Sequence, residues 1–326
     1  MKTALITGIS GQDGGYLAKL LLEKQYHVIG TVRSYGCRDL KNLKYLNIND
    51  NIIIEELDLS DIINIIRIFK KYQPDEIYNL AAQSSVSLSF EQPIGTFSFN
   101  TISVNNLLEA MRLFLPLAKL YQSSSSEMYG NVKNLPINIE TPVSPLSPYA
   151  VSKMSAYFMC LNYRKAYGLF VCNGVLFNHE SFLRSSNFFV KKIIRDALLI
   201  KNGKLTHLTV GNLNIKRDFG FAPKYVEAMW KMLQMDESGD YIVCSGKSVE
   251  LSNIVKYIFR KLNLDRKFIK IDAKLFRPNE IEDIYGDNSR TKTILNWEYN
   301  YSFFDVLDIL IEEEIQYFNK IQNSYK

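Results

Sequence analysis

The sequence has no long hydrophobic run: none of its apolar stretches reaches about 18 residues, the length that a membrane-spanning helix needs. The first residues, Met1 to Thr7, lead into a strand-like segment without the positively charged region and cleavage site of a secretory signal. We therefore expect no membrane anchor, no targeting segment and a cytoplasmic location.

Cysteine and histidine are also scarce, with 4 and 3 copies among 326 residues. The cysteines form no Cys-x-x-Cys pair, and none lies beside a histidine-rich segment. A zinc site or a disulfide framework would need such spacing, so we expect neither, and we expect no bound metal. The four cysteines are Cys37, Cys160, Cys172 and Cys244.

A large excess of one charge is missing as well. The 39 Lys and Arg residues and the 34 Asp and Glu residues leave a formal net charge of +5, and the two signs are interspersed. A nucleic-acid-binding protein would show a basic stripe or patch, so we expect no nucleic-acid partner. Small anionic ligands fit this composition better.

The chain does have a regular alternation of strand-like and helix-like segments over its first 180 residues. Strict alternation indicates βαβ units, so we predict an α/β fold of the Rossmann type with a doubly wound parallel sheet. Beyond about residue 180 the alternation loosens, which indicates a smaller C-terminal lobe over the carboxyl ends of the strands, where ligands of such sheets bind. The expected segments are Ala4–Thr7, Tyr16–Glu23, His27–Val32, Ile52–Glu55, Ile62–Tyr72, Glu76–Ala81, Val104–Leu113 and Leu117–Ser123.

Three glycines follow the first expected strand and open the first expected helix. Gly8, Gly11 and Gly14 form Gly-x-x-Gly-x-x-Gly, in which missing side chains let the backbone approach a pyrophosphate at the positive end of a helix. Such spacing also occurs in purely structural turns. The order of strand, turn and helix favours a dinucleotide site.

The end of the second expected strand indicates which dinucleotide binds. NAD-selective proteins usually carry an acidic residue there, whereas this chain has Arg33, with Arg38 nearby. A cation at this position favours NADP, and the alternative is that Arg33 is an ordinary surface arginine. The topology also places Asp58 and Leu59 near the adenine, and residues 80–84 beneath the nicotinamide ribose.

Tyr149 and Lys153 form a Tyr-x-x-x-Lys pair directly after Ser147 and Pro148. A helix that begins there places the two side chains one turn apart on the same face. Since a neighbouring cation lowers the pKa of a phenol, Tyr149 is predicted to act as a base near neutral pH. The alternative is a chance pair, because the chain holds 20 tyrosines.

A run of serines, Ser123–Ser126, lies at the end of the fifth expected strand. Ser125 can hydrogen-bond the same substrate oxygen as Tyr149, and the order Ser, Tyr, Lys after a glycine-rich turn is typical of short-chain dehydrogenases/reductases. Glu127 follows two residues later. Simple hydride transfer does not need a carboxylate there, but removal of a carbon-bound proton does; the alternative is a surface glutamate on a loop.

Along residues 3–297 the sequence resembles the GDP-mannose 4,6-dehydratases in the order and spacing of its motifs. The segments Phe177–Ser181 and Lys216–Gly220 are the most specific, because other extended short-chain dehydrogenases differ there. The matching segments are Thr7–Leu22, Asn79–Pro93, Ser123–Gly130, Tyr149–Gly168, Cys172–Ser181, Gly211–Gly220 and Arg277–Gly286.

The resemblance implies an NADP-dependent GDP-sugar 4,6-dehydratase. Residues 1–180 would form the NADP-binding Rossmann domain, and residues 181–326 mainly a nucleotide-sugar-binding lobe, from which some strands return to the Rossmann sheet. The implied catalytic residues are Ser125, Glu127, Tyr149 and Lys153. Together with the residues predicted above, the cofactor-binding set is Gly8, Ser10, Gly11, Gln12, Asp13, Gly14, Arg33, Asp58, Leu59, Leu80, Ala81, Ala82, Gln83, Ser84, Tyr149, Lys153, His179 and Arg184. The implied substrate-binding set is Ser85, Ser125, Ser126, Glu127, Asn178, Lys192, Arg217, Arg277 and Glu280.

On this interpretation Tyr149, assisted by Ser125 and Lys153, takes the proton from the sugar O4 while C4 gives a hydride to NADP. The ketone acidifies the C5 proton, Glu127 removes it, water leaves from C6, and the hydride returns to C6 to give a 4-keto-6-deoxy sugar nucleotide. Two alternatives stay open. An epimerase or reductase of the same fold would not require Glu127, and a non-catalytic NADP-binding regulator would need none of these residues.

The chain departs from the family near the expected hexose. Ser125 replaces a threonine, Ser85 a histidine, Gly95 a tyrosine near the cofactor, and Phe182–Asn187 the usual Pro-Arg-Arg-Gly-Glu-Thr stretch. Space and fewer charges suit a bulkier C2 substituent. We therefore predict that GDP-N-acetylglucosamine, the substrate of a related dehydratase on the way to legionaminic acid, competes with GDP-mannose. The alternative is drift in a loop that does not touch the hexose.

The loop after Arg33 also differs from the family. It is shorter than in typical members, where this loop helps to build a tetramer. We expect a homo-oligomer, either a homodimer or a homotetramer, and the shorter loop by itself predicts no more than a dimer.

Overall fold

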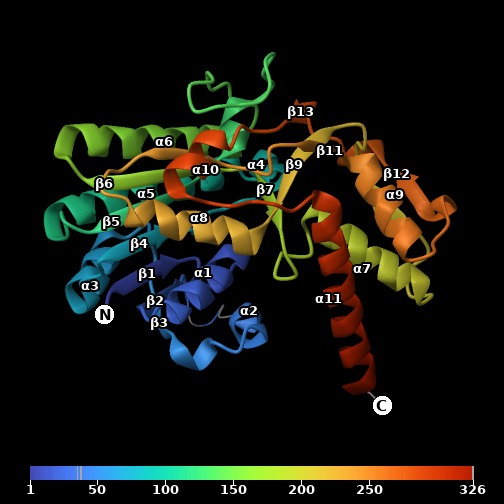
Figure 1. Cartoon of the computed structure of the whole chain (residues 1–326), viewed down its shortest axis with the longest axis horizontal. Helices are drawn as coiled ribbons and strands as arrows, with labels where there is room; N and C mark the ends of the chain where they lie inside the picture. Colours follow the sequence, from blue (N-terminus) through green and yellow to red (C-terminus); the bar gives the residue numbers. More distant parts are fainter. Residues whose placement is uncertain (35, 37–38, 325–326) are drawn as a thin grey trace.

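The computed structural model describes residues 1–34, 36 and 39–324. Cys37 and Arg38, which the sequence analysis considered, lie outside these described residues. Figure 1 shows the chain as a large layered body with a smaller lobe beside it, from which the C-terminal helix extends.

A parallel sheet forms the centre of the large body (Figure 1). Within the described residues, seven strands follow the order β10-β6-β5-β4-β1-β2-β3, and every neighbouring pair runs parallel. The chain runs outward from β1 to β3 and then returns to the other side of β1, which is the doubly wound arrangement. The strands are β1 (Thr3–Thr7), β2 (His27–Val32), β3 (Ile53–Glu56), β4 (Glu76–Asn79), β5 (Lys119–Ser125), β6 (Phe170–Leu176) and β10 (Asp240–Val243).

Helices cover both faces of this sheet, so its central strands are continuous apolar runs. In β1, Ile6 faces the core that α1 (Gln12–Glu23) and α8 (Ala222–Gln234) complete, whereas Leu5 faces the opposite core. That second core is formed with helices α3 (Ile62–Tyr72), α5 (Pro93–Phe114) and α6 (Pro148–Tyr167). The layers confirm the predicted α/β fold of the Rossmann type.

The smaller lobe has an apolar core of its own, built around helices α7 (Phe189–Lys201), α9 (Leu251–Lys261) and α11 (Phe303–Ser324). In the described part of the chain its strands form a four-stranded and a two-stranded sheet. The four-stranded sheet holds β7 (Asn178–Glu180), β9 (Lys216–Phe221), β11 (Ser248–Glu250) and β13 (Asp283–Ile284), and the other pairs β8 (Leu208–Val210) with β12 (Ile269–Ile271).

Residues after 180 contribute to both parts of the molecule. Strand β10 pairs with β6 in the large sheet, and α8 packs on α1. The packing of the described residues therefore does not divide at residue 180, and the two functional domains stay a prediction.

The remaining elements are short, and the sequence analysis did not foresee them. Helix α5 also begins at Pro93, well before the expected Val104, with the proline in its first turn. None of the described helices combines the length and the apolar content needed to cross a bilayer. The short elements are helices α2 (Lys41–Tyr45), α4 (Val86–Glu91) and α10 (Ser289–Leu295), and the 3-10 turns η2 (Asn49–Asn51), η3 (Ser126–Tyr129), η4 (Arg266–Phe268) and η5 (Ala273–Leu275).

Candidate active site

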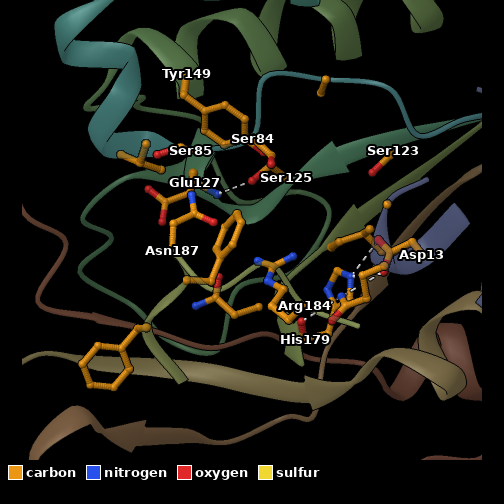
Figure 2. A pocket seen from close by; sticks show the side chains of 18 of the residues that line it. Asp13, Ser84, Ser85, Ser123, Ser125, Glu127, Tyr149, His179, Arg184 and Asn187 are labelled. Atoms are coloured by element: carbon orange, nitrogen blue, oxygen red, sulfur yellow. Dashed lines mark hydrogen bonds and ion pairs between the residues drawn. The ribbon is translucent and has the colours of Figure 1, made fainter. Parts of the chain in front are cut away.

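A cavity of about 740 Å³ lies at the carboxyl ends of the parallel strands, between the large sheet and the smaller lobe. The ends of β1, β4 and β5, the start of α6 and strand β7 all line it. Figure 2 shows Tyr149, Ser125 and Glu127 on one side of the cavity, with Asp13 and His179 on the other. This is the position at which open α/β sheets bind ligands.

The glycine turn between β1 and α1 can exist only with glycine at its tightest points. Gly8 has a φ of +70°, and a Cβ on Gly14 would lie 2.4 Å from the carbonyl oxygen of Gly8. The turn therefore lets the backbone approach a ligand closely. The first N–H groups of α1, which begins at Gln12, lack partners within the helix and so favour an anion.

A buried hydrogen-bond network aligns the neighbouring strand ends. The hydroxyl of Thr7 donates to Oδ1 of Asn79 (2.6 Å) and accepts from the backbone N–H groups of Leu80 and Ala81 (3.1 Å each). The Asn79 amide in turn donates to Gln122 on β5 (2.8 Å). Residues 80–82 are thereby held at the cavity wall.

Arg33 lines the outer end of the cavity, as the sequence predicts for a residue that selects NADP. Its guanidinium lies 5.8 Å from the ring centre of Phe99, and its Nε lies 3.7 Å from Oδ2 of Asp58. Asp58 itself does not line the cavity, although Leu59 does. Asp58 thus pairs with Arg33 in this structure, and its contact with the adenine stays a prediction.

The four predicted catalytic residues converge in one place. Helix α6 begins at Pro148 because Ser147 caps it, accepting from the N–H of Ala150 (3.1 Å), and this start brings Tyr149 and Lys153 to the cavity. The hydroxyl of Ser125, at the end of β5, accepts from the backbone N–H of Glu127 (3.3 Å). The serine is thus fixed next to the carboxylate-bearing residue.

The electrostatics of Tyr149 depend mainly on its burial. Burial raises its pKa to about 12, and the charge of Glu127 raises it as well, while the Ser125 hydroxyl lowers it. The Lys153 ammonium donates to the carbonyl of Ser123 (2.8 Å) and lies 5.9 Å from the ring centre of Tyr149. Burial also lowers the pKa of Lys153 to about 8. The structure thus places Lys153 beside the ring of Tyr149 while burial raises the pKa of the phenol, and the role of Tyr149 as a base near neutral pH stays a prediction.

Two further predicted residues lie outside the cavity wall. The amide of Gln83 faces inward, donating to the carbonyl of Ser85 and to Thr96 (3.0 Å each), and Ser126 is buried in η3. The other predicted residues do line the cavity: Gly8, Ser10, Gly11, Gln12, Asp13, Gly14, Arg33, Leu59, Leu80, Ala81, Ala82, Ser84, Ser85, Ser125, Glu127, Tyr149, Lys153, Asn178, His179, Arg184, Lys192, Arg217, Arg277 and Glu280.

The predicted nucleotide end contains two arginines that share one carboxylate. Arg217 donates to Oε1 of Glu280 (2.8 Å) and to the carbonyl of Ile281 (2.6 Å), and Arg277 reaches the same Oε1 (3.4 Å). Burial lowers the pKa of Arg217, and the charges of Glu127 and Glu280 offset part of this effect. Arg277, which is the more exposed of the two arginines, can offer N–H groups to the oxygens of a diphosphate.

Sequence reasoning missed several residues of the cavity wall. Phe99 lies near Arg33, and Phe188 lies under Arg184, whose guanidinium is 3.6 Å from its ring centre. Asn187, the last residue of the departing Phe182–Asn187 stretch, also lines the cavity. No motif or spacing marks the two phenylalanines, since only the folded chain brings them to the cavity.

Comparison with known proteins agrees with this geometry. A model of the family described as GDP-mannose 4,6 dehydratase matches residues 5–310. The GDP-mannose 4,6-dehydratase of Sinorhizobium fredii is 36% identical over 341 aligned positions, which cover 97% of this chain and 97% of that protein. The chain belongs to the GDP-mannose 4,6-dehydratase family.

Solved structures show how far the family fold extends. A dTDP-glucose 4,6-dehydratase from Bacillus anthracis, in complex with NAD, has a TM-score of 0.86 at 22% identity over 97% of each chain. RMD from Pseudomonas aeruginosa, complexed with NADPH, has a TM-score of 0.79 at 23% identity, covering 96% of this chain and 98% of that one. At these identities the likeness shows the fold alone, and these two proteins hold different dinucleotides.

The residues at which this chain departs from the GDP-mannose 4,6-dehydratase family lie partly at the cavity wall and partly in packed regions away from it. Ser85 lines the cavity and caps α4, accepting from the N–H of Leu88 (3.2 Å). Phe182 instead stacks on Tyr45 (ring centres 4.4 Å apart) and meets Tyr317 of α11 edge-on, and Leu183 is buried against α1. The prediction that Phe182 and Leu183 reshape the wall near the hexose is therefore wrong, because their side chains pack away from the cavity.

Proposed function

We propose that this chain is an NADP-dependent GDP-sugar 4,6-dehydratase that forms a 4-keto-6-deoxy sugar nucleotide. The observation that carries the proposal is the position of Glu127 in the same cavity as Ser125, Tyr149 and Lys153. An epimerase or reductase needs the last three only. A base for a carbon-bound proton is the additional group that a dehydratase requires.

The residues present fit a dinucleotide. The side-chain-free cradle of Gly8 and Gly14 would accept a diphosphate at the start of α1, and Arg33 would face a 2′-phosphate. Tyr149 and Lys153 would hold the nicotinamide ribose. Bound NADP would supply reversible storage of the hydride that leaves C4 and returns to C6.

The residues of the chain account for the proton movements. Tyr149 accepts the proton of O4, helped by the Ser125 hydroxyl, as C4 becomes a ketone. The ketone acidifies the C5 proton, and Glu127 accepts it. The proton on Glu127 can then leave with the C6 hydroxyl as water, which returns the carboxylate to its starting form. When the hydride returns to C6, C5 takes up one proton, and this balances the proton that Tyr149 took from O4 and gives up again.

The purified protein is expected to carry NADP and to turn over without net change in reduced nicotinamide, because each cycle returns the stored hydride. The bound dinucleotide is identified by mass spectrometry after denaturation, and reduced nicotinamide is followed by absorbance during turnover. Arg33→Ala should raise the share of bound NAD. Steady accumulation of NADPH with substrate would point to an ordinary dehydrogenase instead.

For the sugar, we propose that GDP-N-acetylglucosamine competes with GDP-mannose. Since Phe182 and Leu183 do not line the cavity, the support comes from Ser85, where the family carries the larger histidine, and from Asn187, which also lines the cavity. The smaller side chain of Ser85 would leave room for a substituent at C2. This substrate would place the protein in legionaminic acid formation.

Comparing kcat/KM for the two GDP-sugars tests this proposal. We expect Ser85→His to shift the ratio toward GDP-mannose by roughly 10-fold, as one mismatched group in a pocket does. Ser186→His is the matched control, because Ser186 is exposed and does not line the cavity. A clear preference of the unmodified protein for GDP-mannose, unchanged in Ser85→His, would contradict the proposal.

A homodimeric or homotetrameric assembly and a cytoplasmic location remain part of the proposal. The nucleotide sugar and the NADP cofactor of the proposed reaction are both small anions that suit the mixed-charge composition of the chain.

A further inference from the structure

We infer that Gln12, Asp13, His179 and Ser181 form a clamp that positions the start of α1 against β7, and that their side chains shape the cofactor site instead of binding the cofactor. We call these four residues the α1–β7 clamp. The inference rests on the proposed cofactor site. It assigns positioning roles to Ser181 and to Gln12, Asp13 and His179, which the sequence analysis placed in the cofactor-binding set.

The His179 ring is fully engaged by protein atoms. Its Nε2 lies 2.9 Å and 3.0 Å from the two carboxylate oxygens of Asp13, and its Nδ1 lies 2.8 Å from the carbonyl oxygen of Phe177. Both neighbours are hydrogen-bond acceptors, and a ring with an N–H at each nitrogen satisfies both of them. One ring face also stacks on Tyr225, with the centres 4.6 Å apart. The histidine thus keeps no ring N–H for a ligand.

The contact with His179 offsets the negative charge that Asp13 places at the start of α1. Asp13 lies in the first turn, where a carboxylate suits the helix dipole but repels an anion bound at the same helix end. Burial would raise the pKa of Asp13, but the charge of His179 and its hydrogen bond lower it below its usual value. Asp13 therefore stays ionised, and His179 balances its charge beside the expected diphosphate.

Gln12 forms the second arm of the clamp. Its amide donates to Oδ1 of Asp13 (3.0 Å) and to the carbonyl of His179 (3.2 Å), and its Oε1 accepts from the Ser181 hydroxyl (2.8 Å). Ser181 is 1% exposed and does not line the cavity. The side chains of Gln12 and Asp13 thus bind residues 179–181. The first turn of α1 therefore presents its backbone N–H groups to an anion.

The dissociation constant of NADP, measured by calorimetry on the full chain stripped of bound nucleotide, tests the first arm. His179→Leu should weaken binding by about 10-fold, because the uncompensated Asp13 carboxylate then repels the diphosphate at close range. Adding Asp13→Asn to His179→Leu should recover most of this loss, because the unbalanced carboxylate disappears. If His179 bound the cofactor directly, the second substitution would recover nothing.

Ser181 tests the second arm without touching the cavity wall. Ser181→Ala should weaken NADP binding severalfold while Ser181→Thr, which keeps the hydroxyl, restores it; equal affinity in the alanine variant and the wild type would overturn the clamp. His207→Gln, which lies outside the cavity wall, is the control and should bind as the wild type does.

Different results would contradict the clamp and the proposed function. Binding by the wild type, with the losses from His179→Leu and Asp13→Asn simply adding, overturns the clamp and leaves the proposed function standing. Failure of the wild-type chain to bind either NADP or NAD overturns the proposed function and the clamp together.

Discussion

Tyr149→Phe is expected to lower the rate of 4,6-dehydration by about 1,000-fold, within the range that a lost general acid–base group produces. The substitution keeps the buried ring and removes only the oxygen that accepts the O4 proton. Both the first hydride transfer and the loss of water should disappear, because the second step needs the ketone that the first one makes. Product formation is measured by mass spectrometry of the sugar nucleotide.

Tyr167→Phe provides the matched control, since this tyrosine lies at the far end of the same helix and is 53% exposed. It should retain full activity. The raised pKa of Tyr149 adds a second readout: the base form becomes more abundant as the pH rises, so the first hydride transfer of the wild type should accelerate with pH. Near-normal turnover by Tyr149→Phe would contradict the catalytic assignment of Ser125, Tyr149 and Lys153.

Glu127→Gln is expected to lower dehydration by about 100-fold or more while leaving hydride transfer from C4. The amide has nearly the shape of the carboxylate but cannot accept the C5 proton. In deuterated water the wild type should incorporate deuterium into the product, whereas the variant should convert NADP to NADPH within single turnovers and stop.

Glu140→Gln is the control for this experiment, because Glu140 is exposed and does not line the cavity. It should dehydrate its substrate at the wild-type rate. A Glu127→Gln protein that dehydrates at the normal rate would show that another group removes the C5 proton, and the proposal would then lose the observation on which it depends.

The outline of the fold was predictable because local pattern and global topology agree in the first 180 residues. Strand β2 and helix α3 begin and end where the apolar periodicity placed them, at His27–Val32 and Ile62–Tyr72. Helix α5 was harder, since its first half from Pro93 carries no clear helical stripe, and burial of Thr96 and Asn100 in tertiary contacts supports it. The lobe after residue 180 is built from short strands whose partners lie far away in sequence, such as β7 and β9.

In the candidate site, too, local features were predictable from the sequence and long-range contacts were not. Motifs with a mechanical reason, such as Gly8 and Gly14 in the turn or Tyr149 and Lys153 on one helix face, were visible in the sequence because their spacing is local. The stacking of Phe182 on Tyr45 and on helix α11 was not, so the inference about the hexose wall failed there. Sequence comparison shows that a residue differs but not which way its side chain points.

The sequence by itself determined the class of the fold, the glycine turn at the start of α1 and the residue types that acid–base chemistry needs, because each depends on neighbours within a few positions. Tertiary structure alone decided the protonation and the partners of those residues. It buried Tyr149 and raised its pKa, and it paired Asp58 with Arg33. It also turned His179 toward Asp13, 166 residues away, because burial and long-range contacts set the field around a group.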